Sequence, residues 1–214
     1  MPQSSPPDVA LDQIAQTLAP FDVRLSEQQL VAIQKYVSLL LVWNQSVSLT
    51  AIEDPLEIVA RHFGESMFAG SFLRLQSCRL ADVGTGAGFP GMALKVAFPV
   101  VYVILVEPNL KKCAFLNEVK TELDVHGLDV ERTRFEEYRA KVPLDFICSR
   151  ALGDHRRFLQ WARGAIAPDG RVVLWLGAED AARISRVKGW IWDAPVKIPE
   201  SRRRVILCGR QDRS

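Results

Sequence analysis

The sequence predicts an α/β protein with a mostly parallel sheet, an antiparallel hairpin at its C-terminal end and a helical cap at its N-terminus. After about residue 76, short apolar runs alternate with helical patterns, which is typical of βα units. Residues 1–75 show helical patterns instead. The last two apolar runs are joined by a connection too short for a parallel crossover. We therefore expect a cap over residues 1–75 and a sheet domain over residues 76–214.

Two helices are predicted in the cap, and each has a recognisable start. The first, over residues 27–43, follows Ser26 as N-cap, with Gln29 in the reciprocal capping-box position. The second, over residues 55–73, follows Asp54 and has proline at its first position, where a helix needs no amide hydrogen. Both place apolar residues at helical spacing, so each should bury one face.

The sheet domain should contain short strands separated by helices. Its predicted parallel strands are Arg79–Val83, Val101–Val106, Val130–Thr133, Phe146–Ser149 and Val172–Leu176. Its predicted helices are Gly91–Ala97, Lys111–Leu123, Asp154–Ile166 and Asp180–Val187. The hairpin strands are Val196–Ile198 and Arg204–Cys208.

Composition is that of an ordinary globular protein, with 48% hydrophobic and 24% charged residues. No apolar run approaches the roughly 20 residues of a membrane-spanning helix, and the N-terminus has no secretory pattern. We expect a cytoplasmic protein. The four cysteines are widely spaced, so we expect buried, reduced thiols and no metal site.

Charge is distributed unevenly along the chain. Residues 1–76 carry four basic and eight acidic side chains, whereas residues 183–214 carry nine basic and three acidic ones. A basic C-terminal segment suggests a polyanionic partner, although such a run is also common on an ordinary solvated face. Six residues there, three of them consecutive, are candidates for phosphate contacts: Arg183, Arg186, Lys188, Arg202, Arg203 and Arg204.

The strongest chemical signal is the glycine-rich segment 82–91, Asp-Val-Gly-Thr-Gly-Ala-Gly-Phe-Pro-Gly, directly after the first strand. Glycines at positions 84, 86 and 88 let the backbone turn sharply and approach a ligand where a Cβ would intrude. The next helix then begins at the carboxyl edge of the sheet, the usual ligand crevice of open α/β folds. We therefore expect a cofactor here.

The segment favours S-adenosylmethionine over a dinucleotide. Gly86, Gly88 and Gly91 satisfy the dinucleotide fingerprint literally, but that pattern alone is weak. Pro90 removes an amide where the helix would begin to bind a pyrophosphate. S-adenosylmethionine has no phosphates, and an acid at Asp82 heads the loop. We expect Asp82, Gly84 and Gly86 at the cofactor site.

Two further positions support a nucleoside-containing cofactor. Glu107 ends the second strand, 25 residues after Asp82, where an acid can accept hydrogen bonds from ribose hydroxyls. Phe135 and Glu136 follow the third strand and could frame an adenine ring. A charged surface loop is the alternative for that pair.

Five segments then occur in a fixed order: Ser48-Leu49-Thr50-Ala51-Ile52, Arg61-His62-x-x-Glu65-Ser66, the glycine-rich segment 82–91, Arg134-Phe135-Glu136-Glu137 and Ser149-Arg150-Ala151. Together they resemble the ribosomal small-subunit RNA methyltransferase G family, also called glucose-inhibited division protein B. The resemblance extends over about residues 25–180. The glycine loop is generic to class I methyltransferases, but the joint set of segments is specific.

The resemblance implies a class I (Rossmann-like) methyltransferase sheet and methylation of guanine N7 at position 527 of 16S ribosomal RNA. The substrate would be the small ribosomal subunit or an assembly intermediate, and we expect a monomer. The resemblance also implies that S-adenosylmethionine contacts Gly84, Phe89, Phe135, Glu136 and Arg150.

One position departs from the family pattern. The fifth strand ends in Leu176-Gly177, where the family often has Lys-Gly, so the arginines Arg202–Arg204 are candidates to supply the missing charge. His62 could lie in the pocket or be an ordinary, partly buried histidine. Trp190 and Trp192 could stack on bases, but we expect them to pack against the sheet.

Methyl transfer to guanine N7 requires no general base, because N7 already has an in-plane lone pair. We therefore assign no catalytic acid or base. Arg134 and Arg150 are candidate orienting groups, since a guanidinium can bind a carboxylate or a phosphate with two hydrogen bonds. The alternative for each is a structural ion pair with Glu136 or Asp145.

Two other functions remain open from the sequence. A class I methyltransferase acting on a small molecule would use the helical cap as a lid. A noncatalytic nucleic-acid-binding protein would have a vestigial site, but it would have no reason to keep the glycine loop, the ribose acid and the adenine corner together.

Overall fold

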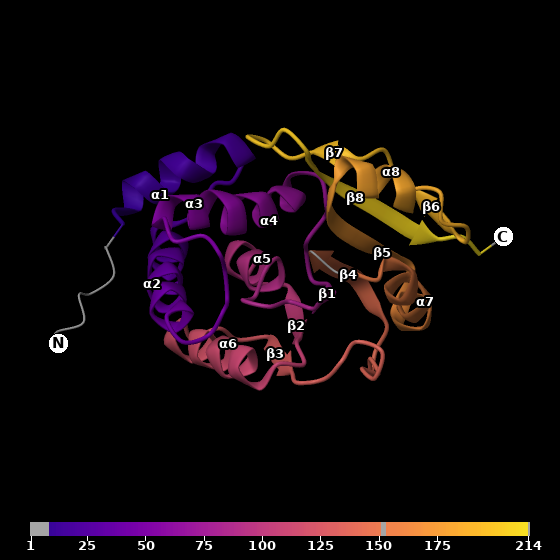
Figure 1. Cartoon of the computed structure of the whole chain (residues 1–214), viewed down its shortest axis with the longest axis horizontal. Helices are drawn as coiled ribbons and strands as arrows, with labels where there is room; N and C mark the ends of the chain where they lie inside the picture. The colour runs from indigo at the N-terminus through magenta and orange to yellow at the C-terminus, as the bar shows by residue number, and fades with distance from the viewer. Residues whose placement is uncertain (1–8, 151–152, 214) are drawn as a thin grey trace.

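The computed structural model describes residues 9–150 and 153–213. Among these residues, eight strands form one sheet, with the order β3-β2-β1-β4-β5-β8-β6 and with β7 paired to β8 (Figure 1). The five strands from β3 to β5 are parallel, and β8 pairs antiparallel with β5, β6 and β7. The strand bounds are β1 (Arg79–Val83), β2 (Tyr102–Val106), β3 (Leu128–Glu131), β4 (Leu144–Arg150), β5 (Ile166–Gly177), β6 (Trp190–Trp192), β7 (Val196–Lys197) and β8 (Arg204–Gln211).

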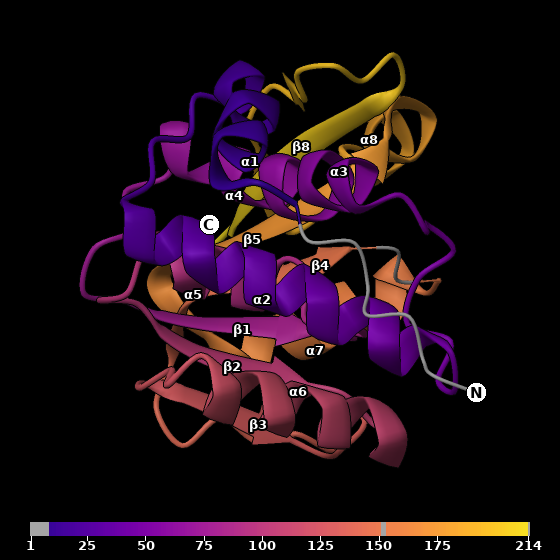
Figure 2. The ribbon, with the colours of Figure 1, turned by 90° about the vertical axis from the view of Figure 1, so that its left-hand side faces the viewer.

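Helices cover both faces of the sheet (Figure 2). One face packs against the cap and the first two helices of the sheet domain, and the other packs against α7 and α8. The helix bounds are α1 (Leu11–Leu18), η1 (Ala19–Phe21), α2 (Glu27–Asn44), α3 (Pro55–Ile58), η2 (Val59–Gly64), α4 (Glu65–Met67), η3 (Phe68–Ser71), α5 (Gly91–Ala97), α6 (Leu110–Glu122), α7 (His155–Ala165) and α8 (Ala178–Ile184).

The capping box that opens α2 also ties the cap to the sheet domain. Ser26 and Gln29 exchange the two predicted hydrogen bonds, between side chain and backbone in each direction. The Gln29 amide also donates to the carbonyl oxygens of Val96 and Ala97 at the end of α5, at 2.8 and 3.0 Å. A local helix signal therefore also fixes where α2 lies on α5.

The predicted architecture is confirmed, and the differences lie in individual elements. The predicted strand Val130–Thr133 was placed two residues too late, because β3 pairs from Leu128 onward with β2 and stops where β2 stops. The predicted helix over residues 55–73 is interrupted by the π-helical turn η2 and finishes as the 3₁₀ turn η3 at Ser71. Helix α1 and strand β6 were not predicted.

Buried side chains follow the predicted pattern for the tryptophans and most cysteines. Trp190 is 6% exposed and packs, with the partly buried Trp192, in the core under α7 and α8. Packing against the sheet is thus confirmed for both. Cys113, Cys148 and Cys208 are buried free thiols, and Cys78 is half-buried. Within the described ranges, no helix is long and apolar enough to cross a membrane.

Candidate functional site

Asp82 organises the glycine loop at the carboxyl end of β1. Its side chain is fully buried, and its Oδ2 accepts hydrogen bonds from Thr85 Oγ1 at 2.5 Å and from the Gly91 amide at 2.7 Å. Burial raises the pKa of Asp82 to about 6. Asp82 Oδ1 is also buried and has no partner among the described residues. Asp82 therefore stabilises the loop through the two hydrogen bonds that Oδ2 accepts. Its Oδ1 accepts no hydrogen bond from the described residues.

The glycines of the loop are required for different reasons. A Cβ on Gly88 (φ +90°) would lie 2.2 Å from the Tyr36 hydroxyl oxygen, and a Cβ on Gly91 would lie 2.5 Å from Leu105. A Cβ on Gly86 (φ +60°) would meet nothing within 4 Å. Gly88 and Gly91 are thus needed for packing, whereas Gly86 faces open space at the sheet edge.

Glu107 lies beside Gly86 at the end of β2. Its side-chain oxygens accept hydrogen bonds from two backbone amides, those of Gly86 at 3.0 Å and Asn109 at 2.9 Å. The residue is only 6% exposed. Because each carboxylate oxygen can accept a second hydrogen bond, Glu107 can still bind a ligand hydroxyl at the open side of Gly86.

Phe89 connects the loop to the cap. Its ring stacks on His62 with centroids 4.7 Å apart and on Tyr36 with centroids 5.4 Å apart, and the Arg150 guanidinium lies 5.6 Å from its centroid. Phe89 is 4% exposed. Its observed contacts are therefore with the cap and β4, and its contact with a cofactor stays a prediction.

His62 is neutral, and both of its ring nitrogens take part in hydrogen bonds. Arg150 Nη2 lies 2.7 Å from His62 Nδ1, and Thr50 Oγ1 lies 2.8 Å from His62 Nε2. A guanidinium can only donate, so Nδ1 accepts and the ring proton lies on Nε2, which donates to Thr50. Burial, with help from Arg150 and Arg61, lowers the pKa of His62 to about 3.

Arg150 links the end of β4 to the π-helical turn. Besides His62, it donates from Nη1 to the Arg61 carbonyl oxygen at 3.0 Å. Burial lowers its pKa, and the carboxylates of Glu65 and Asp82 oppose that shift. Its partners are thus neither of the two acids considered from the sequence, and its observed role is to position the cap against the loop.

A pocket of about 390 Å³ lies at the carboxyl ends of β4 and β5, next to Arg150 and His62. Glu65 is buried there between Arg61, whose Nε lies 3.2 Å away, and Arg204, with which it forms an ion pair. Burial raises the pKa of Glu65, and the two arginines oppose that shift. Arg204 therefore does supply a cation beside Leu176-Gly177, but one already paired with a carboxylate.

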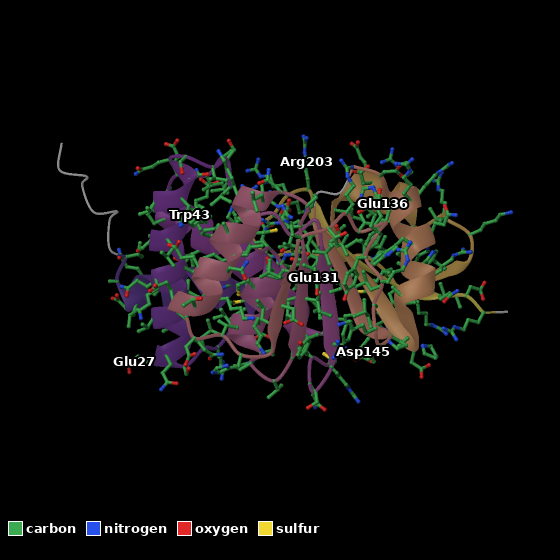
Figure 3. The ribbon with its side chains drawn as sticks, turned by 90° about the horizontal axis from the view of Figure 1, so that it is seen from below. Glu27, Trp43, Glu131, Glu136, Asp145 and Arg203 are labelled. Atoms are coloured by element: carbon green, nitrogen blue, oxygen red, sulfur yellow. The ribbon has the colours of Figure 1, made fainter. Side chains whose placement is uncertain are left out.

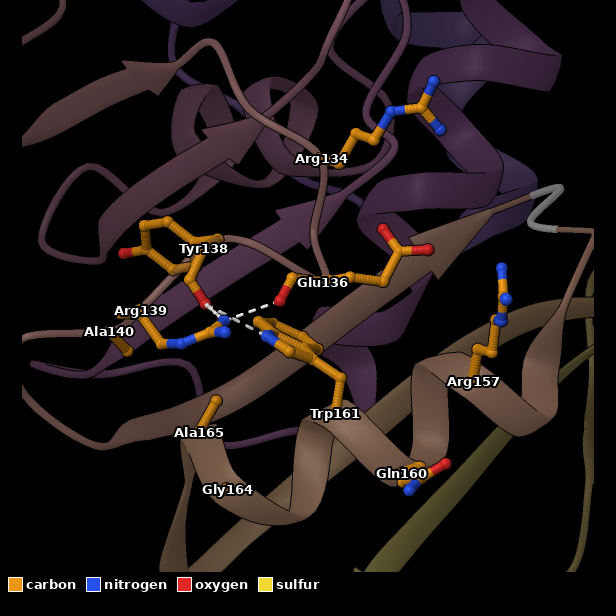
Figure 4. Close-up of a pocket in the computed structure, with 10 residues that line it drawn as sticks. All are labelled: Arg134, Glu136, Tyr138, Arg139, Ala140, Arg157, Gln160, Trp161, Gly164 and Ala165. Carbon is orange, nitrogen blue, oxygen red and sulfur yellow. Dashed lines mark hydrogen bonds between the residues drawn. The ribbon is translucent and has the colours of Figure 1, made fainter.

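The predicted adenine corner is divided between a half-buried and an exposed part. Phe135 packs against Phe158 and Trp161, with centroids 6.3 and 5.7 Å apart. Arg134 and Glu136 are exposed and line a second pocket of about 740 Å³, in which Arg134 points away from Trp161 (Figure 4). Within the described part of the chain, neither of the ion pairs considered for Arg134 forms. Arg134 and Arg150 line different pockets.

Tyr36 contacts the glycine loop, and the sequence did not indicate this contact. It is fully buried, and its hydroxyl donates to the Ala87 carbonyl oxygen in the glycine loop at 2.5 Å. Burial raises its pKa well above the usual value. No local pattern distinguishes this tyrosine from the other core positions of α2. Glu65 appeared in the sequence only as part of the segment Arg61-His62-x-x-Glu65-Ser66, and its place as an acid between Phe63 and Met67 on the apolar stripe could have indicated a buried ion pair.

Comparison with known families decides the class of this site. The family model for rRNA small subunit methyltransferase G matches residues 29–190. The chain belongs to this family. Ribosomal RNA small subunit methyltransferase G from Ectopseudomonas mendocina (strain ymp) is 37% identical over 152 residues, which are 71% of each chain. The same-named protein from Pseudomonas fluorescens (strain Pf0-1) is 36% identical over 74% of this chain and 73% of its own. That from Pseudomonas entomophila (strain L48) is 38% identical over 66% of this chain and 65% of its own, slightly less than two thirds.

Solved structures confirm that this chain has the class I methyltransferase fold. A SAM-dependent methyltransferase from Aquifex aeolicus superposes with a TM-score of 0.59 at 16% identity, covering 73% of this chain and 93% of that one. The glycopeptide N-methyltransferase MtfA, solved with S-adenosyl-L-methionine, superposes with a TM-score of 0.59 at 10% identity, covering 71% of this chain and 87% of that one. As a methyltransferase G family member, the chain is an S-adenosylmethionine-dependent methyltransferase.

Proposed function

We propose that the chain methylates N7 of guanine 527 in 16S ribosomal RNA, with the small subunit or an assembly intermediate as substrate. The observation that supports a methyl-transfer site most directly is the open side of Gly86, with the Glu107 carboxylate 3.0 Å from its amide. The family match supports the RNA substrate. A monomer acting in the cytoplasm, where ribosomal particles are found, is part of the same proposal.

The residues present fit S-adenosylmethionine. Gly86 leaves space that a side chain would fill, and Glu107 offers acceptors for ribose hydroxyls. We propose that Asp82, Gly84 and Gly86 form the cradle, the first of these by holding the loop. The remaining proposed contacts are Glu107, Phe89, Phe135, Glu136 and Arg150. When bound, the cofactor supplies a methyl group activated on a sulfonium.

The chain's own contribution is positioning rather than proton transfer. Guanine N7 needs no base, and His62 is neutral at physiological pH with both ring nitrogens in hydrogen bonds. Alignment of two reactants can contribute roughly 7–11 kcal/mol to lowering a barrier. The pocket beside Arg150 and Glu65 is where the target base would enter, because it opens at the same sheet edge as the glycine loop.

Methyl transfer from labelled S-adenosylmethionine to 30S subunits lacking the modification tests the proposal, with the product mapped in the 16S RNA as 7-methylguanosine. Arg150→Lys keeps the charge but replaces the two guanidinium nitrogens that contact Arg61 and His62 with one ammonium nitrogen, so we expect a roughly ten- to a hundred-fold slower reaction. Arg132→Lys, at an exposed position, is the matched control.

The same assay also distinguishes the proposed RNA methyltransferase from a methyltransferase that acts on a small molecule. If the unmutated protein binds S-adenosylmethionine tightly but methylates no naked RNA, 30S subunit or assembly intermediate, that result favours the alternative, a class I methyltransferase acting on a small molecule. If Arg150→Lys reacts at the wild-type rate, Arg150 does not position the reacting groups.

A further inference from the structure

A basic groove runs between α7 and α8, on the face of the sheet opposite the cap. Its volume is about 870 Å³. Five of the residues that line it are cations and one is a carboxylate: Arg156, Arg163, Arg183, Arg186, Lys188 and Asp154. All five cations are exposed. Such a concentration of one sign of charge in a concave surface raises the local concentration of a polyanion.

Several of these cations are not engaged within the protein. The side chains of Arg156, Arg186 and Lys188 form no hydrogen bond or ion pair with another described residue. Asp154, by contrast, is occupied as the N-cap of α7, accepting from the Arg157 amide at 3.1 Å. The net positive charge of the groove is therefore available to a ligand.

The far end of the groove has a fixed shape. Arg163 reaches from α7 across the groove and donates to the Lys188 carbonyl oxygen at 2.9 Å. This contact requires glycine at position 189, because a Cβ there would lie 1.8 Å from Arg163 Nη2. The segment after α8 is thus tied to α7 by a hydrogen bond from the Arg163 side chain to a backbone carbonyl.

The other end of the groove reaches the methyl-transfer site. His155, at the start of α7, lines both this groove and the pocket that contains Arg150 and Glu65. Arg183 lines the groove and pairs at 2.6 Å with Asp180, which lines the pocket. The groove and the pocket are therefore neighbours along α7.

We propose that this groove binds the phosphate backbone of the RNA strand that flanks the target base. The inference rests on the proposed function and adds the surface that holds the RNA. Guanidinium groups suit phosphate because their planar fork can donate two hydrogen bonds. Helix α7 has 11 residues and is about 16 Å long, so the groove accommodates a few nucleotides rather than a long duplex. Residues 1–76, which contain the cap, carry four basic and eight acidic side chains, so their net charge does not favour a polyanion.

The C-terminal arginines identified in the sequence do not all belong to this surface. Arg183, Arg186 and Lys188 line the groove, whereas Arg202 and Arg203 are exposed in the connection before β8 and Arg204 is paired with Glu65. Arg203 lies at the same end of the molecule as Glu136, with Asp145 at the opposite end (Figure 3). Because Arg202 and Arg203 do not line the groove, the two arginine sets can be tested separately.

The test compares two double variants that remove the same charge. Arg156→Gln/Arg186→Gln removes two unpaired cations from the groove, and Arg24→Gln/Lys35→Gln removes two exposed cations from the cap. The binding of 30S subunits and of a 16S hairpin RNA is measured over a series of salt concentrations. Two lost phosphate contacts should make the slope of log Kobs against log salt less negative by about 1.4 and weaken binding roughly ten-fold at about 0.15 M salt.

We expect only the groove variant to show these changes, with a raised KM for 30S subunits, an unchanged kcat and wild-type affinity for S-adenosylmethionine. Equal effects of the two variants, or a wild-type slope for the groove variant, would overturn the inference.

A larger effect of Arg202→Gln/Arg203→Gln would overturn it too, because the RNA would then lie at the connection before β8. Weaker binding to 30S subunits with unchanged binding to hairpin RNA would instead indicate a ribosomal protein in the groove. The methyl-transfer assay with the unmutated chain tests the proposed function independently of these results.

Discussion

The neutral state of His62 makes a specific prediction about stability and pH. Its native pKa is about 3, against about 6.5 in an unfolded chain. As the pH falls below about 6.5, the unfolded chain takes up a proton on this histidine and the native protein does not. The free energy of unfolding therefore decreases with falling pH, and this contribution is lost progressively from about pH 6.5 down to about pH 3.

The magnitude follows from the two pKa values. Well below the unfolded pKa the loss is about 1.4 kcal/mol per pH unit, and between about pH 7 and about pH 5.5 it amounts to about 1.2 kcal/mol. The variant His62→Gln lacks this titration but keeps one donor and one acceptor for Thr50 and Arg150. Wild type should therefore lose about 1.2 kcal/mol more than the variant over that pH interval.

Urea unfolding at the two pH values measures the difference, since urea leaves the ionic strength unchanged. Contributions from other buried acids, such as Asp82, are present in both proteins and cancel in the comparison. His126→Gln, at an exposed position, controls for the loss of a histidine. Equal pH dependence of wild type and His62→Gln would refute the reasoning, as would an NMR titration of the His62 ring near pH 6.5.

Three further outcomes concern the glycine loop. Gly86→Val should remain folded, because its side chain meets no other atom, but should lose about 1–3 kcal/mol of stability, because a φ of +60° is strained for a β-branched residue, and should abolish S-adenosylmethionine binding in calorimetry; wild-type affinity would show that the cofactor lies elsewhere. Gly88→Ala should lower the free energy of unfolding by about 2–3 kcal/mol, because its Cβ would overlap the Tyr36 hydroxyl and its φ is +90°; unchanged urea unfolding would contradict this packing. Tyr36→Phe should cost about 1–3 kcal/mol by leaving the Ala87 carbonyl buried without its donor, and an equal or greater midpoint in urea would show that this hydrogen bond adds no stability.

Local patterns were sufficient for much of the fold and for the first part of the site. The bounds of β1 and α5 agree with the prediction, since an apolar run ending in glycines and a helix start after Pro90 are encoded within a few residues. The position of Glu107 beside Gly86 also follows from sequence, because adjacent parallel strands end at the same sheet edge. The order of the elements along the chain and the spacing of the glycines and acids are enough to predict these bounds and this neighbourhood.

Features that depend on partners distant in the sequence were decided by the tertiary structure. Strand β6 has three residues and exists through its pairing with β8, so its own sequence carries too little signal. Arg150 meets His62 and Arg61 although nearly 90 residues separate them, because β4 ends beneath the π-helical turn of the cap. Likewise, the basic groove arises only when α7 and α8 pack on the same face of the sheet.

The sequence therefore determined the residues of the loop and the class of chemistry. Packing determined which charges are paired and which remain available, because burial and distance set the strength of every electrostatic contact.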